Sequence, residues 1–296
     1  MRPGAFRAAA RACLAACLAG CAPEPGVVAE GAAERVVSLD VCADQFVVEL
    51  VGRERIAALS PDATKDFSMV RERARGIRQM RPTAEEVLAL GPDRIVRSHG
   101  GGPNAARFFR RAGVPVVQIG FAGDLAGVRE VITAAAEGLG APERGAALLA
   151  AMDARLARAA APDASGRGWP SGLYLVPGGV SAGSGTLPDE LLRAAGIANF
   201  ETRSGYPPIP LERLAYQQPD LYAVAFLGST AAYEGSWSAF NHRIVRERLR
   251  TGRVALLDGS WMACAGPGVV EAVAVLRRVA RQVPDEPGGS PPFPAP

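Results

Sequence analysis

Short apolar runs alternate with stretches of helical periodicity along most of the chain. The runs are rich in Val, Ile, Leu and Ala, and we expect buried strands at residues 35–39, 55–59, 94–96, 114–119, 173–176, 221–226 and 254–257. Apolar positions at helical spacing predict helices at residues 43–51, 83–90, 105–112, 125–139, 143–160, 187–195, 211–215, 242–249 and 269–282. Strands and helices that alternate in this way predict an α/β fold with a mostly parallel sheet.

The alternation is interrupted once, by the longest helical segment, and then begins again. Pro142 suits the first turn of that helix, and Pro162 follows its last turn. The interruption predicts two α/β lobes joined by one long helix, and a Pro-rich tail follows the second lobe. We place a first lobe at residues 35–141, the linking helix at 142–162, a second lobe at 163–282 and a disordered tail at 283–296.

One sequence unit occurs twice. Glu85 precedes Pro92-Asp93 after a helical turn and before an expected strand, and Glu212 precedes Pro219-Asp220 in the same way. The two glutamates and the two Pro-Asp pairs are each 127 residues apart. Any helix that leads through Pro-Asp into a strand looks similar, but the shared acid and the equal spacing favour a duplicated lobe.

The first residues have the pattern of an export signal. The first twenty residues carry three arginines as their only charges, followed by a short apolar stretch that ends in Leu18-Ala19-Gly20-Cys21. These four residues match the bacterial lipoprotein box, in which the cysteine is acylated, although a plain secretory signal remains the alternative. We expect a signal peptide at residues 1–20, a lipidated tether at 21–34 and a protein anchored in the cell envelope at Cys21.

Charge and composition exclude several classes of function. Lys and Arg number 33 against 30 Asp and Glu, and three of the arginines lie in the expected signal, so the rest of the chain is neutral. A neutral body does not favour nucleic-acid binding, which needs clustered basic residues. No run of 18 apolar residues occurs, so we expect no membrane-spanning helix after the signal.

Two cysteines remain after Cys21, and Cys42 and Cys264 either form a disulfide or are buried separately.

Catalysis has one candidate motif. Gly179-Val180-Ser181-Ala182-Gly183 fits the G-x-S-x-G pattern of serine hydrolases, and His242 is the only histidine after it. The expected helix begins too late for a nucleophile elbow, and His242 falls early in a helix, so an exported serine hydrolase is the alternative hypothesis. The spacing of histidines and cysteines indicates no resident metal, and no nucleotide-binding motif occurs. We therefore expect a protein that is not an enzyme and has no cofactor.

Polar, Gly-rich and aromatic residues gather where expected strands end. In an open α/β sheet these carboxyl ends form the binding crevice, and the loops of two lobes would face each other across a cleft. Aromatic side chains in these loops suit a planar ligand, although each one could equally be a packing residue. They are His99, Tyr206, Tyr233, Trp237 and Trp261.

Four features of the sequence occur together: the lipoprotein box, the start Arg35-Val-Val-Ser-Leu-Asp-Val-Cys-Ala-Asp44, the segment Gln79-Met-Arg-Pro-Thr-Ala-Glu85 and the two Pro-Asp units. With these features the chain resembles the substrate-binding lipoproteins of ABC importers for iron complexes and cobalamin. The resemblance extends over about residues 35 to 281 and includes Trp261 with Gly266-Pro267 before the last helix. It implies two Rossmann-like lobes bridged by one rigid helix, with a metal chelate bound between them.

The resemblance also implies roles for individual residues. Glu85 and Glu212 fall on the acids with which each lobe docks onto the permease, which works with an ATPase; the receptor itself is expected to be a monomer. His99 and Tyr206 occupy positions of ligand-contacting tryptophans in cobalamin-binding members, while Trp261 matches a tryptophan found there. Two tryptophans are thus replaced, and the acid before Trp261 is Ser260, so the chain departs from the pattern of the cobalamin-binding members at three positions. We expect ligand contacts from Arg97, His99, Ser184, Tyr206, Tyr233, Trp237, Ser260 and Trp261.

Overall fold

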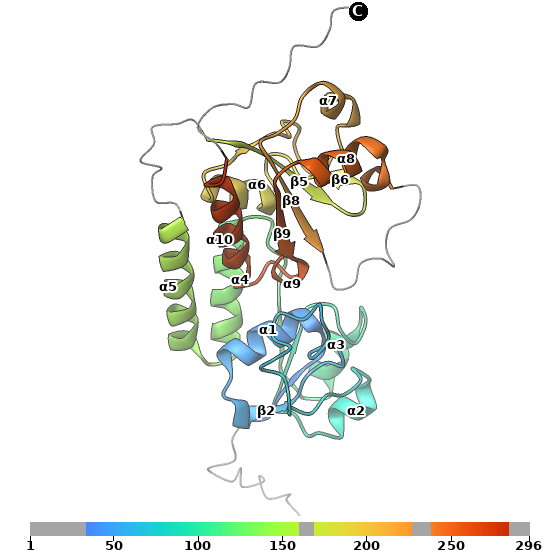
Figure 1. Cartoon of the computed structure of the whole chain (residues 1–296). Helices are drawn as coiled ribbons and strands as arrows, with labels where there is room; N and C mark the ends of the chain where they lie inside the picture. Colours follow the sequence, from blue (N-terminus) through green and yellow to red (C-terminus); the bar gives the residue numbers. More distant parts are fainter. Residues whose placement is uncertain (1–33, 160–168, 227–237, 284–296) are drawn as a thin grey trace, which may run out of the picture. The chain divides into compact units, whose positions relative to one another are not determined.

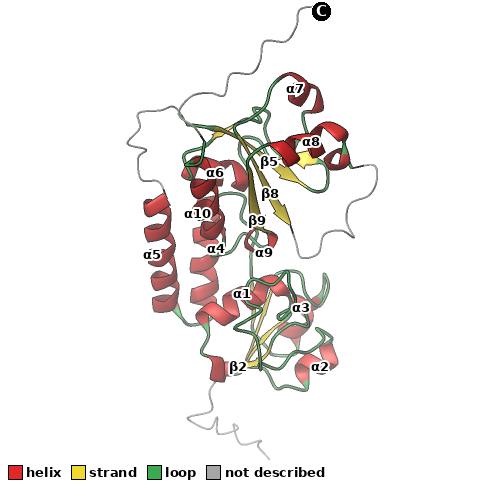
Figure 2. Ribbon diagram, in the orientation of Figure 1, coloured by secondary structure: helices red, strands yellow, loops and turns green. Residues whose placement is uncertain are grey.

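The computed structural model describes residues 34–159, 169–226 and 238–283, which belong to one compact unit that begins at Glu34. This part of the chain contains two separate β-sheets with helices packed against them (Figures 1 and 2). The expected signal, the tether up to residue 33 and the tail from residue 284 lie outside the described residues. None of the described helices is long and apolar enough to cross a membrane.

The first sheet has four strands, and every pair is parallel. Its order is β2-β1-β3-β4, with β1 and β3 in the centre. The central strands are buried on both faces, and Val36, Val37, Ile95 and Val96 have no exposed surface. Strands buried in this way read as short continuous apolar runs, which is the pattern that the sequence shows. The bounds are β1 Val36–Ser38, β2 Ile56–Ala58, β3 Arg94–Arg97 and β4 Val116–Gln118.

The helices of this part begin at side-chain caps. Asp40 accepts a hydrogen bond from the backbone N–H of Ala43 at the start of α1, and Asp124 does the same for Gly127 at the start of α4. Helix α4 carries one apolar stripe that faces the core, whereas α1 is buried over most of its surface, with Asp44 and Gln45 among its buried residues. The bounds are α1 Val41–Leu50, α2 Ala84–Leu88, α3 Ala105–Arg111 and α4 Leu125–Gly138, with a 3₁₀ turn at Arg53–Arg55.

The second sheet follows the order β6-β5-β8-β9, with the short β7 beside β5. Among the strands that the structure describes in this sheet, only β6 is antiparallel to its neighbour, because it returns from β5 through a tight hairpin. The strands are β5 Ser171–Val176, β6 Val180–Ser181, β7 Ala198–Asn199, β8 Leu221–Phe226 and β9 Val254–Asp258. The helices are α6 Leu187–Ala194, α7 Leu211–Tyr216, α8 Arg243–Thr251, α9 Gly259–Met262 and α10 Val269–Ala280, and a 3₁₀ turn spans Ala239–Asn241. The predicted α/β class with parallel sheets is confirmed.

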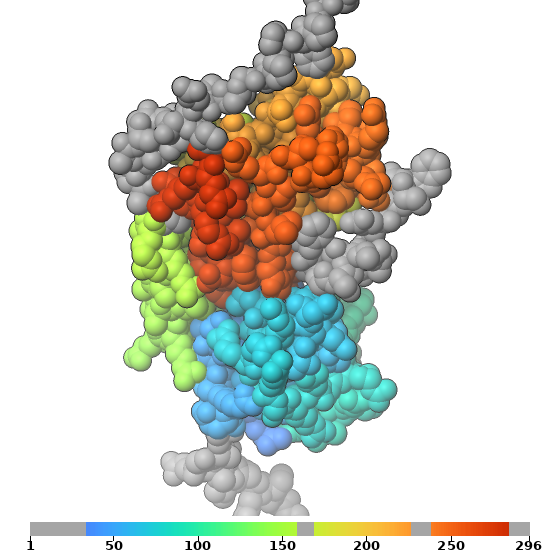
Figure 3. Space-filling view, in the orientation of Figure 1, coloured from blue at the N-terminus to red at the C-terminus, as the bar shows by residue number. Residues whose placement is uncertain are grey.

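Helix α5 (Pro142–Ala159) contacts elements of both halves. Near its start, Arg144 donates to the carbonyl of Leu50 at the end of α1. Further along, Arg155 pairs with Glu271 of α10, and Figure 3 shows the two helices side by side. Residues 160–162 of the expected linking helix lie outside the described residues, so its full extent stays a prediction.

The aspartates of the two Pro-Asp units make equivalent hydrogen bonds. The carboxylate of Asp93 accepts from the backbone N–H of Arg35, just before β1, at 2.7 Å. The carboxylate of Asp220 accepts from the backbone N–H of Ser171, at the start of β5, also at 2.7 Å. Each aspartate thus caps the first strand of its own sheet, which supports the duplication inferred from spacing.

Candidate functional site

The side chain of Asp40 forms hydrogen bonds with the loops at the carboxyl edge of the first sheet. It follows β1, and one carboxylate oxygen accepts from the backbone N–H groups of Ser98, His99 and Gly100 at 2.7, 3.1 and 2.8 Å. The other oxygen accepts from Ala43 and from the Ser98 hydroxyl. Burial acts to raise the pKa of Asp40, but the backbone N–H donors hold it below its ordinary value. Asp40 therefore stays ionised and ties the loop after β3 to the start of α1.

Asp44, one helical turn later, fixes the loop after β2. It has no exposed surface, and its two oxygens accept from the backbone N–H of Ser60 at 3.0 Å and from the Ser60 hydroxyl at 2.6 Å. Burial raises the pKa of Asp44 to about 6, and the hydrogen bonds from Ser38 and Ser60 only partly offset that effect. Asp40 and Asp44, which belong to the same sequence motif, thus connect the loops that follow β1, β2 and β3.

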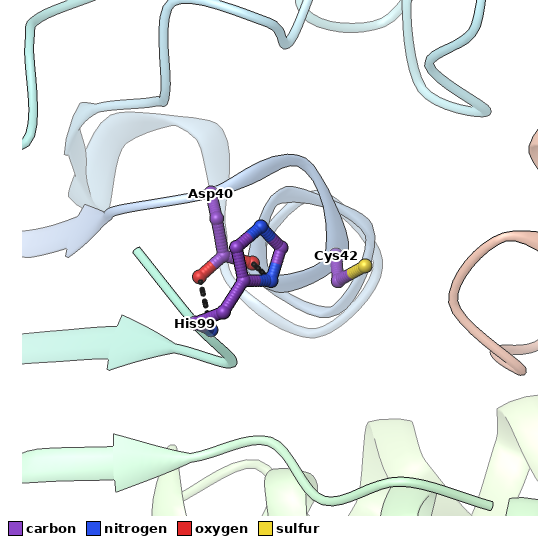
Figure 4. Close-up of side chains that lie close together, drawn as sticks. All are labelled: Asp40, Cys42 and His99. Atoms are coloured by element: carbon purple, nitrogen blue, oxygen red, sulfur yellow. Dashed lines mark hydrogen bonds and ion pairs between the residues drawn. The ribbon is translucent and has the colours of Figure 1, made fainter. Parts of the chain in front are cut away.

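His99 projects from this edge. The side chain is 72% exposed, and its Nδ1 lies 2.7 Å from the hydroxyl of Ser98. Asp40 lies 4.0 Å from the same nitrogen (Figure 4). Because one ring nitrogen faces these partners, Nε2 is the nitrogen that a bound molecule can reach.

Arg97 lies beneath the loop that carries His99. The side chain is buried, and it donates to the carbonyls of Gly100 and Gly102 at 2.8 and 3.1 Å and to the side-chain oxygen of Gln118 at 2.9 Å. These bonds hold the Gly-rich loop in shape. The sequence suggested Arg97 as a ligand contact, and the structure gives it a supporting position below the edge.

Asp40, Cys42 and His99 form a cluster whose potential ligand atoms lie within 4.8 Å of one another (Figure 4). Cys42 is bonded to Cys264, so its sulfur is not a free thiolate. Both oxygens of Asp40 already accept hydrogen bonds. While the disulfide is intact, His99 is therefore the only member of the cluster that still offers a ligand atom to a metal, and that atom is its Nε2. The disulfide is one of the two states that the sequence left open for the cysteines.

Two predicted site residues of the second half lie in paired loops. The backbone N–H of Ser184 donates to the carbonyl of Arg203 at 3.2 Å, and the carbonyl of Ser184 accepts from Gly205 at 3.0 Å. Tyr206 follows directly and is 54% exposed. Burial of its hydroxyl end raises the pKa of Tyr206, so the phenol is neutral at physiological pH.

Glu201 anchors the same loop and was not singled out from the sequence. It is buried, and both of its oxygens accept from the guanidinium of Arg203, at 2.9 and 2.7 Å. The hydroxyl of Ser181 also donates to it, at 2.9 Å. Burial acts to raise the pKa of Glu201, but Arg203 and Ser181 together lower it to about 2.

The G-x-S-x-G pattern has a structural explanation. Ser181 has no exposed surface, lies in β6, and directs its hydroxyl to Glu201. Gly179 adopts a φ of +91° in the hairpin between β5 and β6. Gly183 lies so close to the carbonyl of Arg203 that a side chain would collide with it. His242 caps α8 by accepting from the N–H of Ile244. The serine hydrolase alternative has no support, because Ser181 is not presented as a nucleophile.

Ser260 and Trp261 lie on a helix that the sequence did not predict. Residues 259–267 read as a loop, but Asp258 accepts from the N–H of Ser260 at 2.9 Å and so starts α9. Ser260 is buried, and its hydroxyl has no partner among the described residues. Trp261 lines a pocket of about 410 Å³ with Met69 and Met152. This pocket borders α5 and α10 and does not include His99 or Tyr206.

The remaining predicted positions divide into two groups. Glu85 and Glu212 lie in the first turns of α2 and α7, and both side chains are exposed. Tyr233, Trp237 and Cys21 lie outside the described residues. Asp40 and Asp44 were visible in the sequence only as part of the Ser-Leu-Asp start, because their partners are distant in the chain.

The comparison with protein families gives one match: the sequence model of the periplasmic binding protein family matches residues 48–234. No curated protein sequence matches the chain. The resemblance inferred from the motifs is confirmed.

Solved structures agree with the family match. The periplasmic heme-binding protein BhuT, in complex with two hemes, is 25% identical, with a TM-score of 0.61 over 84% of this chain and 98% of that one. A periplasmic heme-binding protein from Pseudomonas aeruginosa is also 25% identical, with a TM-score of 0.61 over 86% and 95%. The periplasmic vitamin B12-binding protein BtuF of Vibrio cholerae is 17% identical, with a TM-score of 0.53 over 84% and 97%, and this likeness concerns the fold alone.

Proposed function

Because the chain belongs to the periplasmic binding protein family, we propose that it captures a metal chelate and delivers it to the permease of an ABC importer. The chelate class comprises haem, ferric siderophores and cobalamin-like compounds, and haem is the first candidate. The two solved structures with 25% identity are both haem-binding proteins, which favours haem within this class. The observation that carries the proposal is the exposed imidazole of His99 at the carboxyl edge of the first sheet.

His99 has the features of an axial ligand to iron. Histidines that bind metals direct their second ring nitrogen to a hydrogen-bonding partner, which orients the ring. Here Ser98 occupies Nδ1, so Nε2 is left for the iron. Tyr206 is the other exposed candidate, but a raised pKa makes its phenolate harder to form. His99 is therefore the stronger donor at neutral pH.

Other predicted contacts complete the proposed site. Tyr206 and the backbone around Ser184 would face the ligand from the second half, together with Tyr233 and Trp237. Ser260 and Trp261 follow the carboxyl end of β9, but Ser260 is buried and Trp261 lines the separate pocket beside α5 and α10, so we do not include them in the site around His99. Arg97 would act by shaping the loop under His99. The protein binds and releases the chelate and carries out no covalent chemistry on it.

A haem titration tests this proposal directly. Ferric haem is added to the protein, and the Soret absorbance is recorded for wild type, His99→Asn and His242→Asn. The matched control replaces the only other histidine, and asparagine can keep its helix cap. We expect His99→Asn to shift the Soret band and weaken binding by about tenfold or more, as loss of a metal ligand should. His242→Asn should behave as wild type. If wild type binds neither haem, cobalamin nor ferric siderophores, the proposed function is wrong.

Glu85 and Glu212 are the proposed docking residues for the permease. Both carboxylates are exposed in the first turn of a short helix, where they can meet arginines of a partner. Glu85→Arg combined with Glu212→Arg should abolish chelate uptake while leaving chelate binding intact. Glu130→Arg, an exposed acid on α4, is the matched control and should leave uptake unchanged. Normal uptake with the folded double variant would contradict the docking assignment.

The family is periplasmic, so the chain is an exported protein. We further propose that residues 1–20 are removed, that Cys21 carries a lipid and that the receptor acts as a monomer. A lipid label should appear on wild type and not on Cys21→Ser, whereas a plain secretory signal would leave both unlabelled.

A further inference from the structure

The disulfide joins two segments that follow strands of different sheets. Cys42 lies in the first turn of α1, just after β1, and Cys264 lies between α9 and α10, just after β9. Their Cα atoms are 5.3 Å apart, although 222 positions separate them in the sequence. The bond therefore attaches the carboxyl edge of the first sheet to that of the second.

Beside the disulfide, buried apolar residues of α1 and of the segment around Ala265 belong to one core cluster, and a single ion pair is found there among the described residues. Arg71 and Asp258 form an ion pair at 3.7 Å, and both side chains are about one-third exposed. Pairs of this kind contribute little, because water competes for both charges. Gly266 packs against Gln45 and Phe46 of α1, which adds a small contact on the same side. The disulfide adds a covalent attachment to these packing contacts.

The segment that carries Cys264 is strained. Ala265 has a φ of +44°, and it is the only non-glycine residue with a positive φ in the described part of the chain. An L-residue with a side chain adopts this conformation only when its surroundings impose it. The disulfide on one side, the Gly266 contact on the other and the burial of Ala265 in the main apolar core are the constraints that the structure provides. Breaking the bond would let residues 263–266 relax away from α1.

The disulfide is also close to the proposed ligand residue and open to a reductant. The sulfur of Cys42 lies within 4.8 Å of a ring nitrogen of His99. Both cysteines are partly exposed, so a dithiol could reach them. A chelate bound to His99 would sit beside the bond.

We propose that the Cys42–Cys264 disulfide is a redox-sensitive strap beside the ligand site, which retains the chelate when bonded and speeds its release when reduced. The strap's effect on the chelate rests on the proposed function. The reductant is a dithiol of the thiol–disulfide oxidoreductase class. One of its thiolates attacks a sulfur of the strap and forms a mixed disulfide, and its second thiolate resolves that intermediate. The strap gains two electrons and two protons and becomes two thiols, while the dithiol becomes a disulfide.

The first experiment uses wild-type protein and ferric haem, so it does not depend on a variant that folds. Haem is displaced by an excess of a haem scavenger, and the dissociation rate is compared before and after reduction with a dithiol. Relaxing the strained segment should speed dissociation by about tenfold. Cys42→Ser with Cys264→Ser should release haem at the reduced rate under both conditions. Equal rates for oxidised and reduced wild type would overturn the proposal, even though haem binding itself would stand.

A second readout needs no ligand. Amide hydrogen exchange of residues 259–268 is measured in the oxidised and the reduced protein, with α8 as an internal reference. Reduction should speed exchange in that segment by about tenfold and leave α8 unchanged. Equal exchange rates for residues 259–268 in the oxidised and the reduced protein would overturn the proposal that the disulfide acts as a strap. If haem and the other chelates fail to bind but exchange rises, the strap stands and the proposed function fails.

Discussion

Replacing Asp44 by asparagine tests whether a buried carboxylate sets the pH dependence of stability. Asp44 has no exposed surface, and burial raises its pKa to about 6, against about 3.9 for an unperturbed aspartate. Because the folded pKa is the higher one, the folded state binds the proton more tightly than the unfolded chain does. The stabilising contribution is complete below about pH 4 and is lost as the pH rises through about 6.

The magnitude follows from the shift. A difference of about two pKa units at about 1.4 kcal/mol each amounts to about 3 kcal/mol between acidic and neutral pH. Asparagine is neutral throughout, and its side-chain oxygen can still accept from the N–H of Ser60. Relative to wild type, Asp44→Asn should therefore gain about 3 kcal/mol in unfolding free energy between pH 4 and pH 7.5.

Urea unfolding followed by circular dichroism, at four pH values across this range, measures the difference between the two proteins. Asp66→Asn, an exposed aspartate in the loop after β2, is the matched control and should show no such dependence. A wild-type-minus-variant difference that stays constant from pH 4 to pH 7.5 would refute the assignment of the raised pKa to Asp44.

Two further predictions concern the loop that carries Tyr206. Glu201 has a lowered pKa of about 2, so its stabilising contribution is present above about pH 4.3 and is lost as the pH falls through 2. Thermal unfolding from pH 5 to pH 2 should therefore show a loss in wild type that is absent in Glu201→Gln, and parallel curves would contradict the assignment. Ser181→Ala removes a hydroxyl that donates to the buried carboxylate and should lower the unfolding free energy by about 1.5–3 kcal/mol. It should leave haem binding unchanged, and loss of haem binding in the folded variant would show that Ser181 has a role at the ligand.

The regular elements could be predicted because each is encoded locally. Central strands such as β3 are continuous apolar runs, and α4 and α10 carry a clear apolar stripe. The elements that were missed are very short. Strands β6 and β7 have two residues each, which is too few for a periodic pattern, and α9 depends on a single cap at Asp258.

The candidate site was less predictable, because its contacts join residues far apart in the chain. The position of His99 after a strand indicated its exposure at the sheet edge. The sequence predicted Arg97 as a ligand contact, and its hydrogen bonds to the Gly-rich loop could not be predicted, because an arginine after a strand is compatible with both positions. Asp40 meets its partners 58 to 60 positions away, and Cys42 meets Cys264 at 222. No local sequence pattern predicts contacts between residues this far apart in the chain.

The disulfide also changes the topology of the covalent chain. Between Cys42 and Cys264 the polypeptide is a closed ring that contains most of both sheets. A single proteolytic cut anywhere within that ring opens it without releasing a fragment. Nicked and intact protein would therefore have the same mass on a denaturing gel without reductant, and the nicked protein would separate into two fragments only after the disulfide is reduced. In an oxidising compartment, the receptor can thus survive one cleavage as a single covalent molecule.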